Sequence, residues 1–205
     1  HPLSHTLATE EERYVYLFGS TDTARHITAL AVLDANGYVR VTSRRSTSPQ
    51  VIINYSERAY FAVHRDRVNA GLFISRPINA NLGNELPVVV LSKRLTREDG
   101  SFNGVVVMAL DMAYFLDLFT GLTLGEDGVI SLYSDDGVTY MRVPYSASVI
   151  GREISNRPNF QRLKAMLSEN DGNFFARSTA DGVTRLYTFR RIPDAPLIVL
   201  LGLSL

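Results

Sequence analysis

The chain has 205 residues, of which 45% are hydrophobic and 20% are charged, so it can bury the core of one large or two small globular domains. Its 21 basic and 21 acidic residues balance and are scattered, which argues against the basic surface of a nucleic-acid-binding protein. The lack of cysteine excludes disulfide bonds, thiol catalysis and cysteine-ligated zinc.

The N-terminal segment, residues 1–26, predicts a helix that we interpret as a truncated stalk. Thr9 followed by three glutamates is typical of a helix start, where a hydroxyl and acidic side chains stabilise the first turn. Residues 1–9 lack the apolar core of a signal peptide. No run approaches the roughly 20 apolar residues of a membrane span, and the apolar residues 196–205 predict a buried strand.

Residues 27–120 predict an antiparallel sheet and two short helices. A hairpin is expected over 29–42, because the Asn-Gly pair at 36–37 supplies the positive backbone angles that a tight turn needs. Ser56 is the candidate N-cap of the helix that follows. Further strands are expected at 72–78, 86–95 and 103–111, and a second helix at 112–119.

Residues 121–205 repeat this order of elements. A strand, turn and strand are expected over 129–143, with Gly137 in the position of Gly37. Pro158 suits the first turn of the next helix, which is expected to end near residue 167. Three more strands are expected at 174–178, 184–191 and 197–205.

The internal repeat predicts an α+β protein of two tandem modules. Each module is expected to have a central antiparallel sheet of about five strands flanked by helices. The first module is expected to span 27–120 and the second 121–205, with the division between Phe119 and Gly128.

The two copies differ at the positions that could bind a charged ligand. The last strand of the first module ends on Asp111, where the second has Ser204. The first helix carries Arg58, Tyr60 and Phe61, and the corresponding part of the second carries Asn159, Phe160 and Gln161. This alignment predicts ionic groups for a charged ligand in the first module only.

Arg58, Tyr60 and Asp111 are the leading candidates for a ligand site. Arginine presents a rigid fork of donors that matches a carboxylate, tyrosine adds a flat wall and a hydroxyl, and aspartate accepts from an ammonium group. Together they suit a small carboxylate or an amino acid. The alternative is that Arg58 and Asp111 pair with each other or face solvent.

The sequence contains no recognisable catalytic or cofactor motif. The four histidines show no metal-ligand spacing, and the His-Arg-Asp at 64–66 lacks the other motifs of a kinase. No nucleophile elbow, phosphate-binding loop or dinucleotide fingerprint is present. We therefore expect no metal, no cofactor and no enzymatic activity in this chain.

Six stretches carry a resemblance to a known family. They are Arg-Ala-Tyr-Phe at 58–61, Gly-Leu-Phe-Ile-Ser-Arg-Pro at 71–77, Leu-Ser-Lys-Arg at 91–94, Asp-Gly-Ser-Phe-Asn-Gly-Val-Val-Val at 99–107, Asp-Gly-Val-Thr-Arg-Leu-Tyr at 181–187 and Pro-Leu-Ile-Val at 196–199. These stretches resemble the extracytoplasmic double-Cache sensor domain, a tandem PAS-like fold, of bacterial transmembrane receptors. The resemblance covers about residues 27–205.

The resemblance implies a periplasmic sensor domain held between two membrane spans of a sensor histidine kinase or diguanylate cyclase. It implies that the membrane-distal first module binds a small carboxylate or amino acid and relays its presence across the membrane. The ligand-binding residues that it implies are Arg58, Tyr60, Phe61, Ser75, Arg76 and Asp111. The family's tyrosine five residues before the arginine is Ile53 here, which leaves carboxylates other than α-amino acids open.

The alternative function is a ligand-free structural spacer or dimerisation module of a membrane receptor. Receptors of the resembled family commonly dimerise through a long amino-terminal helix, and little of such a helix precedes Thr9. We therefore expect the chain to be a monomer or a weak dimer in dilute solution, although a homodimer is implied for the full-length receptor.

Overall fold

The computed structural model describes residues 26–44, 53–79 and 86–204. These residues form two compact units: the first module consists of residues 26–44, 53–75 and 88–111, and the second consists of residues 76–79, 86–87 and 112–204. The division follows Asp111, ahead of the expected range 119–128, because the helix after Asp111 packs against a strand of the second module. The stalk helix expected in the N-terminal segment lies outside the described residues.

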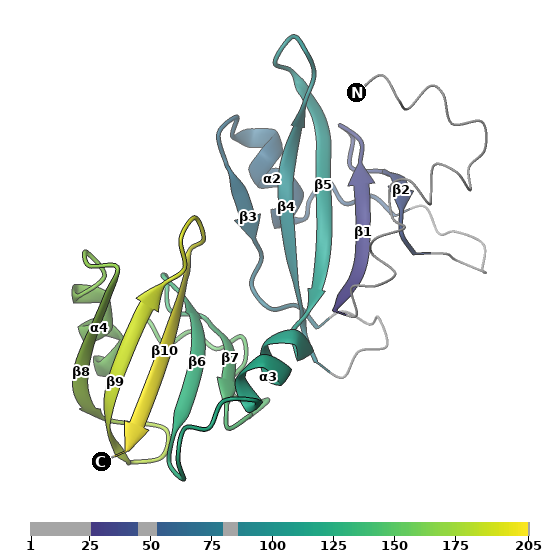
Figure 1. Ribbon diagram of the computed structural model, residues 1–205. Helices are drawn as coiled ribbons and strands as arrows, with labels where there is room; N and C mark the ends of the chain where they lie inside the picture. The colour runs from purple at the N-terminus through teal and green to yellow at the C-terminus, as the bar shows by residue number, and fades with distance from the viewer. Residues whose placement is uncertain (1–25, 45–52, 80–85, 205) are drawn as a thin grey trace. The chain divides into compact units, whose positions relative to one another are not determined.

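The first module is a five-stranded antiparallel sheet with one helix (Figure 1). Its elements are β1 (Ile27–Leu33), β2 (Val39–Thr42), α2 (Ala59–Asp66), β3 (Leu72–Ile74), β4 (Val88–Thr96) and β5 (Phe102–Asp111). The strand order is β2-β1-β5-β4-β3, so β5 is the central strand and pairs with both β1 and β4. Helix α2 packs on β3, β4 and β5. The predicted hairpin, helix and antiparallel strands are confirmed.

A buried aromatic ring holds α2 against the sheet. Phe61 is fully buried and packs with Leu33 of β1 and Val105 of β5. Its ring meets that of Phe102 edge to face, with 5.4 Å between the ring centroids, an arrangement that aromatic pairs favour. Phe61, at the third helical position, thus anchors the start of α2 on the sheet.

Two element ends in the first module differ from the sequence prediction. Helix α2 begins at Ala59 with Arg58 as its N-cap, because the expected cap, Ser56, lies in the preceding turn. Strand β3 ends at Ile74 and not at residue 78. Beyond Ile74 the Val90 N–H donates to the Ser75 hydroxyl and not to a backbone carbonyl, and this interrupts the regular ladder.

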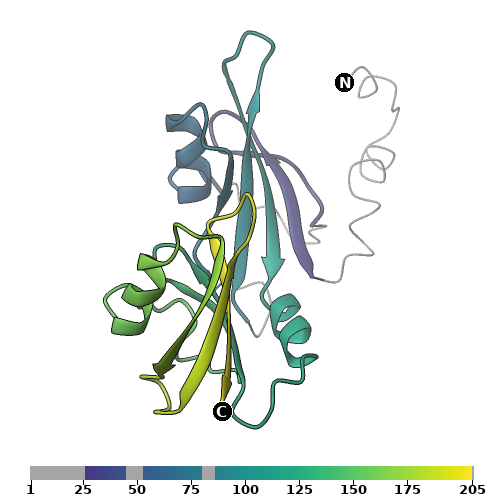
Figure 2. The same cartoon turned by 60° about the vertical axis from the view of Figure 1, so that its left-hand side comes forward.

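The second module repeats this architecture (Figure 2). Its elements are α3 (Ala113–Thr120), β6 (Val129–Ser134), β7 (Thr139–Val143), α4 (Pro158–Ala165), β8 (Asp171–Arg177), β9 (Thr184–Arg191) and β10 (Leu197–Ser204). The strand order β7-β6-β10-β9-β8 is that of the first sheet, with β10 in the centre. The predicted strands and helices are confirmed, although α4 ends two residues before 167 and β8 begins three residues before 174.

Side chains from α4 and from four strands form the core of the second module. Phe160 and Leu163 project from α4 and are 2% and 1% exposed. The buried residues around them are Val129, Tyr133, Phe174, Tyr187, Phe189, Ile198 and Leu200. As in the first module, the burial of one helix face fixes the helix on its sheet.

The two modules share their backbone geometry at the first hairpin turn. Gly37 and Gly137 both have positive φ angles, +89° and +92°. A Cβ atom would lie 2.6 Å from the N atom of Ser56 at the first glycine and 2.9 Å from the Cα atom of Ser155 at the second. Each turn therefore requires glycine for two reasons: the positive backbone angle and the close approach of the loop before the helix. The predicted correspondence of the two glycines is confirmed.

The same geometry aligns the two helices residue by residue. Arg58 and Arg157 are the N-caps of α2 and α4, and their N–H groups donate to Tyr55 O at 3.0 Å and Ile154 O at 2.9 Å. The counterparts of Arg58, Tyr60 and Phe61 are therefore Arg157, Asn159 and Phe160. The alignment expected from sequence, with Asn159, Phe160 and Gln161, is wrong. The reason is that the stretch from turn glycine to arginine is one residue shorter in the second module (157 − 137 = 20, against 58 − 37 = 21).

Candidate functional site

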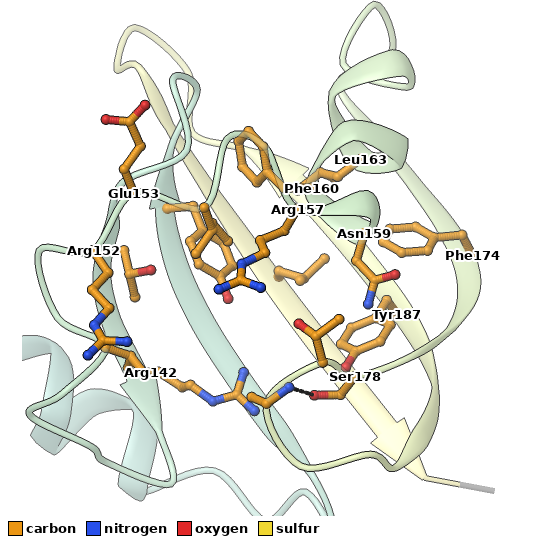
Figure 3. Close-up of a pocket in the computed structure, with 17 residues that line it drawn as sticks. Arg142, Arg152, Glu153, Arg157, Asn159, Phe160, Leu163, Phe174, Ser178 and Tyr187 are labelled. Carbon is orange, nitrogen blue, oxygen red and sulfur yellow. Dashed lines mark hydrogen bonds between the residues drawn. The ribbon is translucent and has the colours of Figure 1, made fainter.

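The second module contains a cavity of about 360 Å³ between α4 and its sheet (Figure 3). Its floor is apolar and comes from α4 and four strands: Tyr133, Phe160, Leu163, Phe174, Tyr187 and Leu200. Its rim is polar and consists mainly of Arg142, Arg152, Glu153, Arg157, Asn159 and Ser178. An apolar cavity of this size with a few convergent polar groups is typical of a small-molecule site.

The floor of the cavity is formed by core side chains, each at most 9% exposed. The rings of Phe174 and Tyr187 stack with 5.5 Å between centroids, and Tyr133 meets Phe160 edge to face at 6.2 Å. Close packing in the core holds these rings in place. The apolar surface is therefore formed before any ligand arrives.

Arg142 on β7 is the most buried of the three arginines at the rim. Its guanidinium nitrogens lie 3.4 Å from the Ser131 hydroxyl and 3.4 Å from an Asp181 carboxylate oxygen. Asp181 also accepts from Arg185 Nη1 at 2.8 Å, and this bond holds the pKa of Asp181 well below its usual range. Arg142 thus shares a carboxylate that already has a closer cationic partner.

Backbone hydrogen bonds fix the loop that carries Arg152 and Arg157. The Thr139 N–H donates to the Arg152 carbonyl at 2.9 Å, and the Ile154 N–H donates to the Gly137 carbonyl at 2.8 Å. Both arginine side chains are exposed, and Figure 3 shows Arg157 reaching over the floor of the cavity. Within the described part of the chain, neither guanidinium has a hydrogen bond or an ion pair.

The carboxylate at the rim, Glu153, is engaged away from the cavity. Its Oε2 atom lies 3.4 Å from Arg76 Nη1, and its Oε1 atom accepts from the Ser155 hydroxyl at 2.8 Å. In Figure 3 its side chain points away from the centre of the cavity. With three guanidinium groups and one carboxylate in the lining, the rim carries a net positive charge.

In the first module, Arg58 and Tyr60 lie together at the start of α2. The Arg58 side chain is exposed and that of Tyr60 is half-buried. Burial raises the pKa of Tyr60 to about 12, and the positive charge of Arg58 opposes this rise. Phe61, the neighbouring candidate, belongs to the module core described above.

Asp111 lies at the C-terminal end of β5, opposite Val88 of β4. It is half-buried, and its N–H donates to the His26 carbonyl at 2.8 Å. Phe61 of α2 packs against Val105, and Asp111 lies six residues further along the same strand, a distance of about 20 Å. The structure thus brings Arg58 and Tyr60 together at the start of α2 and places Asp111 at the other end of β5.

Ser75 and Arg76, the remaining candidates, belong to different modules. Ser75 is buried beside β4, where its hydroxyl accepts from the Val90 N–H at 2.9 Å and its own N–H donates to the Val90 carbonyl at 2.9 Å. Arg76 is part of the second module, and its Nη2 atom lies 2.9 Å from Asp136 Oδ2. Both of these charged side chains are more than half exposed (57% and 56%).

Two further kinds of feature are absent from residues 26–44, 53–79 and 86–204. These ranges contain no group of three or more histidine, aspartate or glutamate side chains placed to hold a metal ion. They also contain no helix that is long and apolar enough to cross a membrane.

Comparison with known proteins decides the family. The extracellular domain of rpHK1S-Z16, a protein named as a histidine kinase, is 31% identical to this chain and has a TM-score of 0.80. The match covers 96% of this chain and 78% of that one. The dCache_1-like family, described as "Histidine kinase sensor domain", matches residues 112–202. The chain belongs to the double-Cache sensor domains.

Two ligand-binding domains share the fold at lower identity. The ligand-binding domain of PctC, an amino acid chemoreceptor of Pseudomonas aeruginosa PAO1, was solved with GABA; it is 16% identical, with 97% of this chain and 83% of that chain covered and a TM-score of 0.64. The ligand-binding domain of Mlp24 with asparagine is 15% identical, with 95% and 77% covered and a TM-score of 0.58. No curated protein sequence matches this chain.

Sequence reasoning missed the arginines of the second module, and the prediction of ionic groups in the first module only is wrong. A signal for Arg157 was present, because Ser-Asn-Arg-Pro-Asn-Phe at 155–160 repeats the Ser-x-Arg-x-x-Phe pattern of 56–61. Arg142 and Arg152 had no such signal. They meet only because the Thr139 N–H binds the Arg152 carbonyl and thereby brings the loop back to β7.

Proposed function

We propose that this double-Cache domain is the ligand-sensing part of a transmembrane receptor, and that its first module captures a small carboxylate or amino-acid-like metabolite. Ligand binding biases the conformation of an adjoining membrane helix. This helix transmits the signal to an output domain, which is a histidine kinase or a diguanylate cyclase. The domain is periplasmic in this proposal, anchored by flanking membrane spans within a homodimeric receptor. The kinship with sensor domains of histidine kinases supports it.

The observation that carries the proposal is the placement of Arg58. Its backbone is fixed as the N-cap of α2, the side chain is exposed, and the Tyr60 hydroxyl lies within its electrostatic reach. A guanidinium fork beside a phenol is suited to a carboxylate, which accepts two parallel hydrogen bonds from arginine and a third from tyrosine.

The solved relatives support a ligand that carries a carboxylate. The PctC domain was solved with GABA and the Mlp24 domain with asparagine, and both compounds have a carboxylate and an ammonium group. In this chain Arg58 takes the carboxylate of the ligand. Asp111, which the sequence also indicated, lies at the other end of β5, about 20 Å along the strand from the residue that Phe61 contacts, so a ligand of this size held by Arg58 does not reach it.

Calorimetric titration of the 205-residue chain with GABA, asparagine and succinate tests the proposal. Arg58→Ala is expected to weaken binding of the active compound at least about tenfold, because the carboxylate loses its bidentate partner. Arg67→Ala removes the same charge from the other end of α2 and should change affinity less than about twofold. Full affinity in Arg58→Ala would place the site elsewhere.

A second variant tests whether Asp111 belongs to the site. Asp111→Ala should change the affinity for GABA, asparagine and succinate less than about twofold, because this carboxylate lies at the other end of β5 from Arg58. A loss of at least about tenfold for GABA and asparagine alone would show instead that Asp111 accepts from their ammonium groups. If the wild-type chain binds none of the three compounds, the result favours a ligand-free spacer.

A further inference from the structure

We propose that the second module holds a separate ligand site, in the cavity beneath Arg157, for a small organic carboxylate with an apolar body. This site goes beyond the first-module site proposed above and uses none of its residues. In the proposal the carboxylate meets the guanidinium groups at the rim and the apolar body lies on the aromatic floor.

The positive charge of the rim points to an anion. The guanidinium groups of Arg152 and Arg157 have no hydrogen-bond or ion-pair partner within the described part of the chain, and Arg142 has two contacts at 3.4 Å. The rim carboxylate, Glu153, is bound by Arg76 and by the Ser155 hydroxyl. Three cations around one opening repel one another, and a bound anion relieves this repulsion.

The floor of the cavity points to an organic anion and not to a bare inorganic one. Its six side chains include four aromatic rings, and all six belong to the buried core. A ligand that covers apolar surface gains affinity by removing it from water, and sulfate or phosphate has no apolar part that could do so. A cavity of about 360 Å³ accommodates a ligand with one ring or a short branched chain.

The repeat gives this site a definite geometric relation to the first module. Arg157 and Arg58 occupy the same N-cap position, and Asn159 and Phe160 follow where the first module has Tyr60 and Phe61. Removal of either side chain leaves the cap geometry unchanged, because neither makes a side-chain cap hydrogen bond. Each arginine is therefore a matched control for the other.

Three probes test the class of ligand: phenylacetate, its neutral isostere phenylacetamide, and sulfate. Titrations followed by calorimetry and by amide NMR shifts should show phenylacetate binding the wild-type chain at least about tenfold more tightly than either other probe. The shifted amides should include those of Thr139, Asn159 and Ala180, which line the cavity.

Variants locate the phenylacetate site. Arg157→Ala should weaken the binding of phenylacetate at least about tenfold. Two control variants should each change the affinity for phenylacetate less than about twofold. They are Lys164→Ala, which removes an exposed positive charge from the same helix, and Arg58→Ala. A urea titration of each variant confirms that it is folded.

Four outcomes would overturn the proposal: no binding of phenylacetate, equal binding of phenylacetamide, equal or tighter binding of sulfate, or full affinity in Arg157→Ala. Equal weakening by Lys164→Ala also contradicts it, because this would indicate general charge attraction. The two proposals can be disproved independently of each other. Arg157→Ala leaves GABA, asparagine and succinate binding unchanged if only the first-module proposal is correct, and Arg58→Ala leaves phenylacetate binding unchanged if only the present one is.

Discussion

His64 Nε2 and Ser92 Oγ lie 3.0 Å apart inside the first module and share a hydrogen bond. The two residues are 0% and 2% exposed. The helix alignment and the strand pairings place Leu163 and Phe189 at the corresponding positions of the second module, where both are buried in an apolar core. The first module thus holds a polar pair where its repeat holds an apolar one.

The first prediction concerns this pair. His64→Leu leaves the Ser92 hydroxyl buried without its partner and should lower the free energy of unfolding by about 1–3 kcal/mol. Adding Ser92→Ala to His64→Leu removes the unsatisfied hydroxyl and should restore part of that loss. Urea denaturation followed by circular dichroism measures both variants, and a double variant less stable than His64→Leu would contradict the argument.

The second prediction is a pH dependence of stability that His64 causes. Burial lowers the pKa of His64, the nearby Arg94 guanidinium lowers it further, and Nδ1 has no hydrogen-bond partner among the described residues. A histidine in the unfolded chain titrates near about 6.5, so the unfolded state takes up the proton first as pH falls. Stability is therefore fully present above about pH 7 and declines below about pH 6.5.

The decline should not exceed about 1.4 kcal/mol per pH unit, the limit for one proton. Thermal unfolding of wild type and His64→Leu between about pH 8 and pH 5.5 measures it, because the difference between the two curves isolates His64. Parallel curves would show that His64 does not titrate in this window.

The third prediction concerns the turn glycine of the second module. Gly137→Ala forces a side chain onto a positive φ and against the backbone of Ser155 at 2.9 Å, and should cost about 2–3 kcal/mol of unfolding free energy. Gly151 has a φ of +75° but nothing within 4 Å of an added Cβ atom, so Gly151→Ala should cost only about 1 kcal/mol. Equal losses in urea denaturation would mean that the contact with Ser155 contributes nothing.

The fourth prediction concerns the Asp181–Arg185 pair. Arg185 is 2% exposed, and its guanidinium donates to Asp181 Oδ1 at 2.8 Å and to the Asp127 carbonyl at 2.6 Å. Asp181→Asn leaves this buried cation without its anion and should cost about 2–3 kcal/mol. Asp136→Asn breaks the exposed pair with Arg76 and should cost less than about 1 kcal/mol.

The same pair contributes to acid sensitivity. Because the pKa of Asp181 is held well below its usual range, the contribution of the pair is present above about pH 4 and is lost as pH falls below that value. Thermal unfolding between about pH 5 and pH 3 should therefore show a smaller decline in Asp181→Asn than in wild type. An equal decline would assign the acid sensitivity to other carboxylates.

The sequence by itself determined the local elements and their repeated order. The turns at Gly37 and Gly137, the helix around Phe61 and the antiparallel strands were predictable, because each depends on short-range preferences and on the period of apolar residues. The double-Cache resemblance was visible for the same reason, since its stretches coincide with these elements. Of the site, the sequence indicated Arg58 and Tyr60, which lie two residues apart on one helix turn.

Only the tertiary structure decided which charged groups meet. Arg142, Arg152 and Arg157 line one cavity because β7, the loop after it and the start of α4 are joined by backbone hydrogen bonds between distant residues. It also placed Arg76 in the second module beside Asp136, sixty residues further along the chain. Long-range pairing of strands and loops depends on the packing of the whole module, and a one-residue difference in loop length is enough to shift an alignment made from sequence.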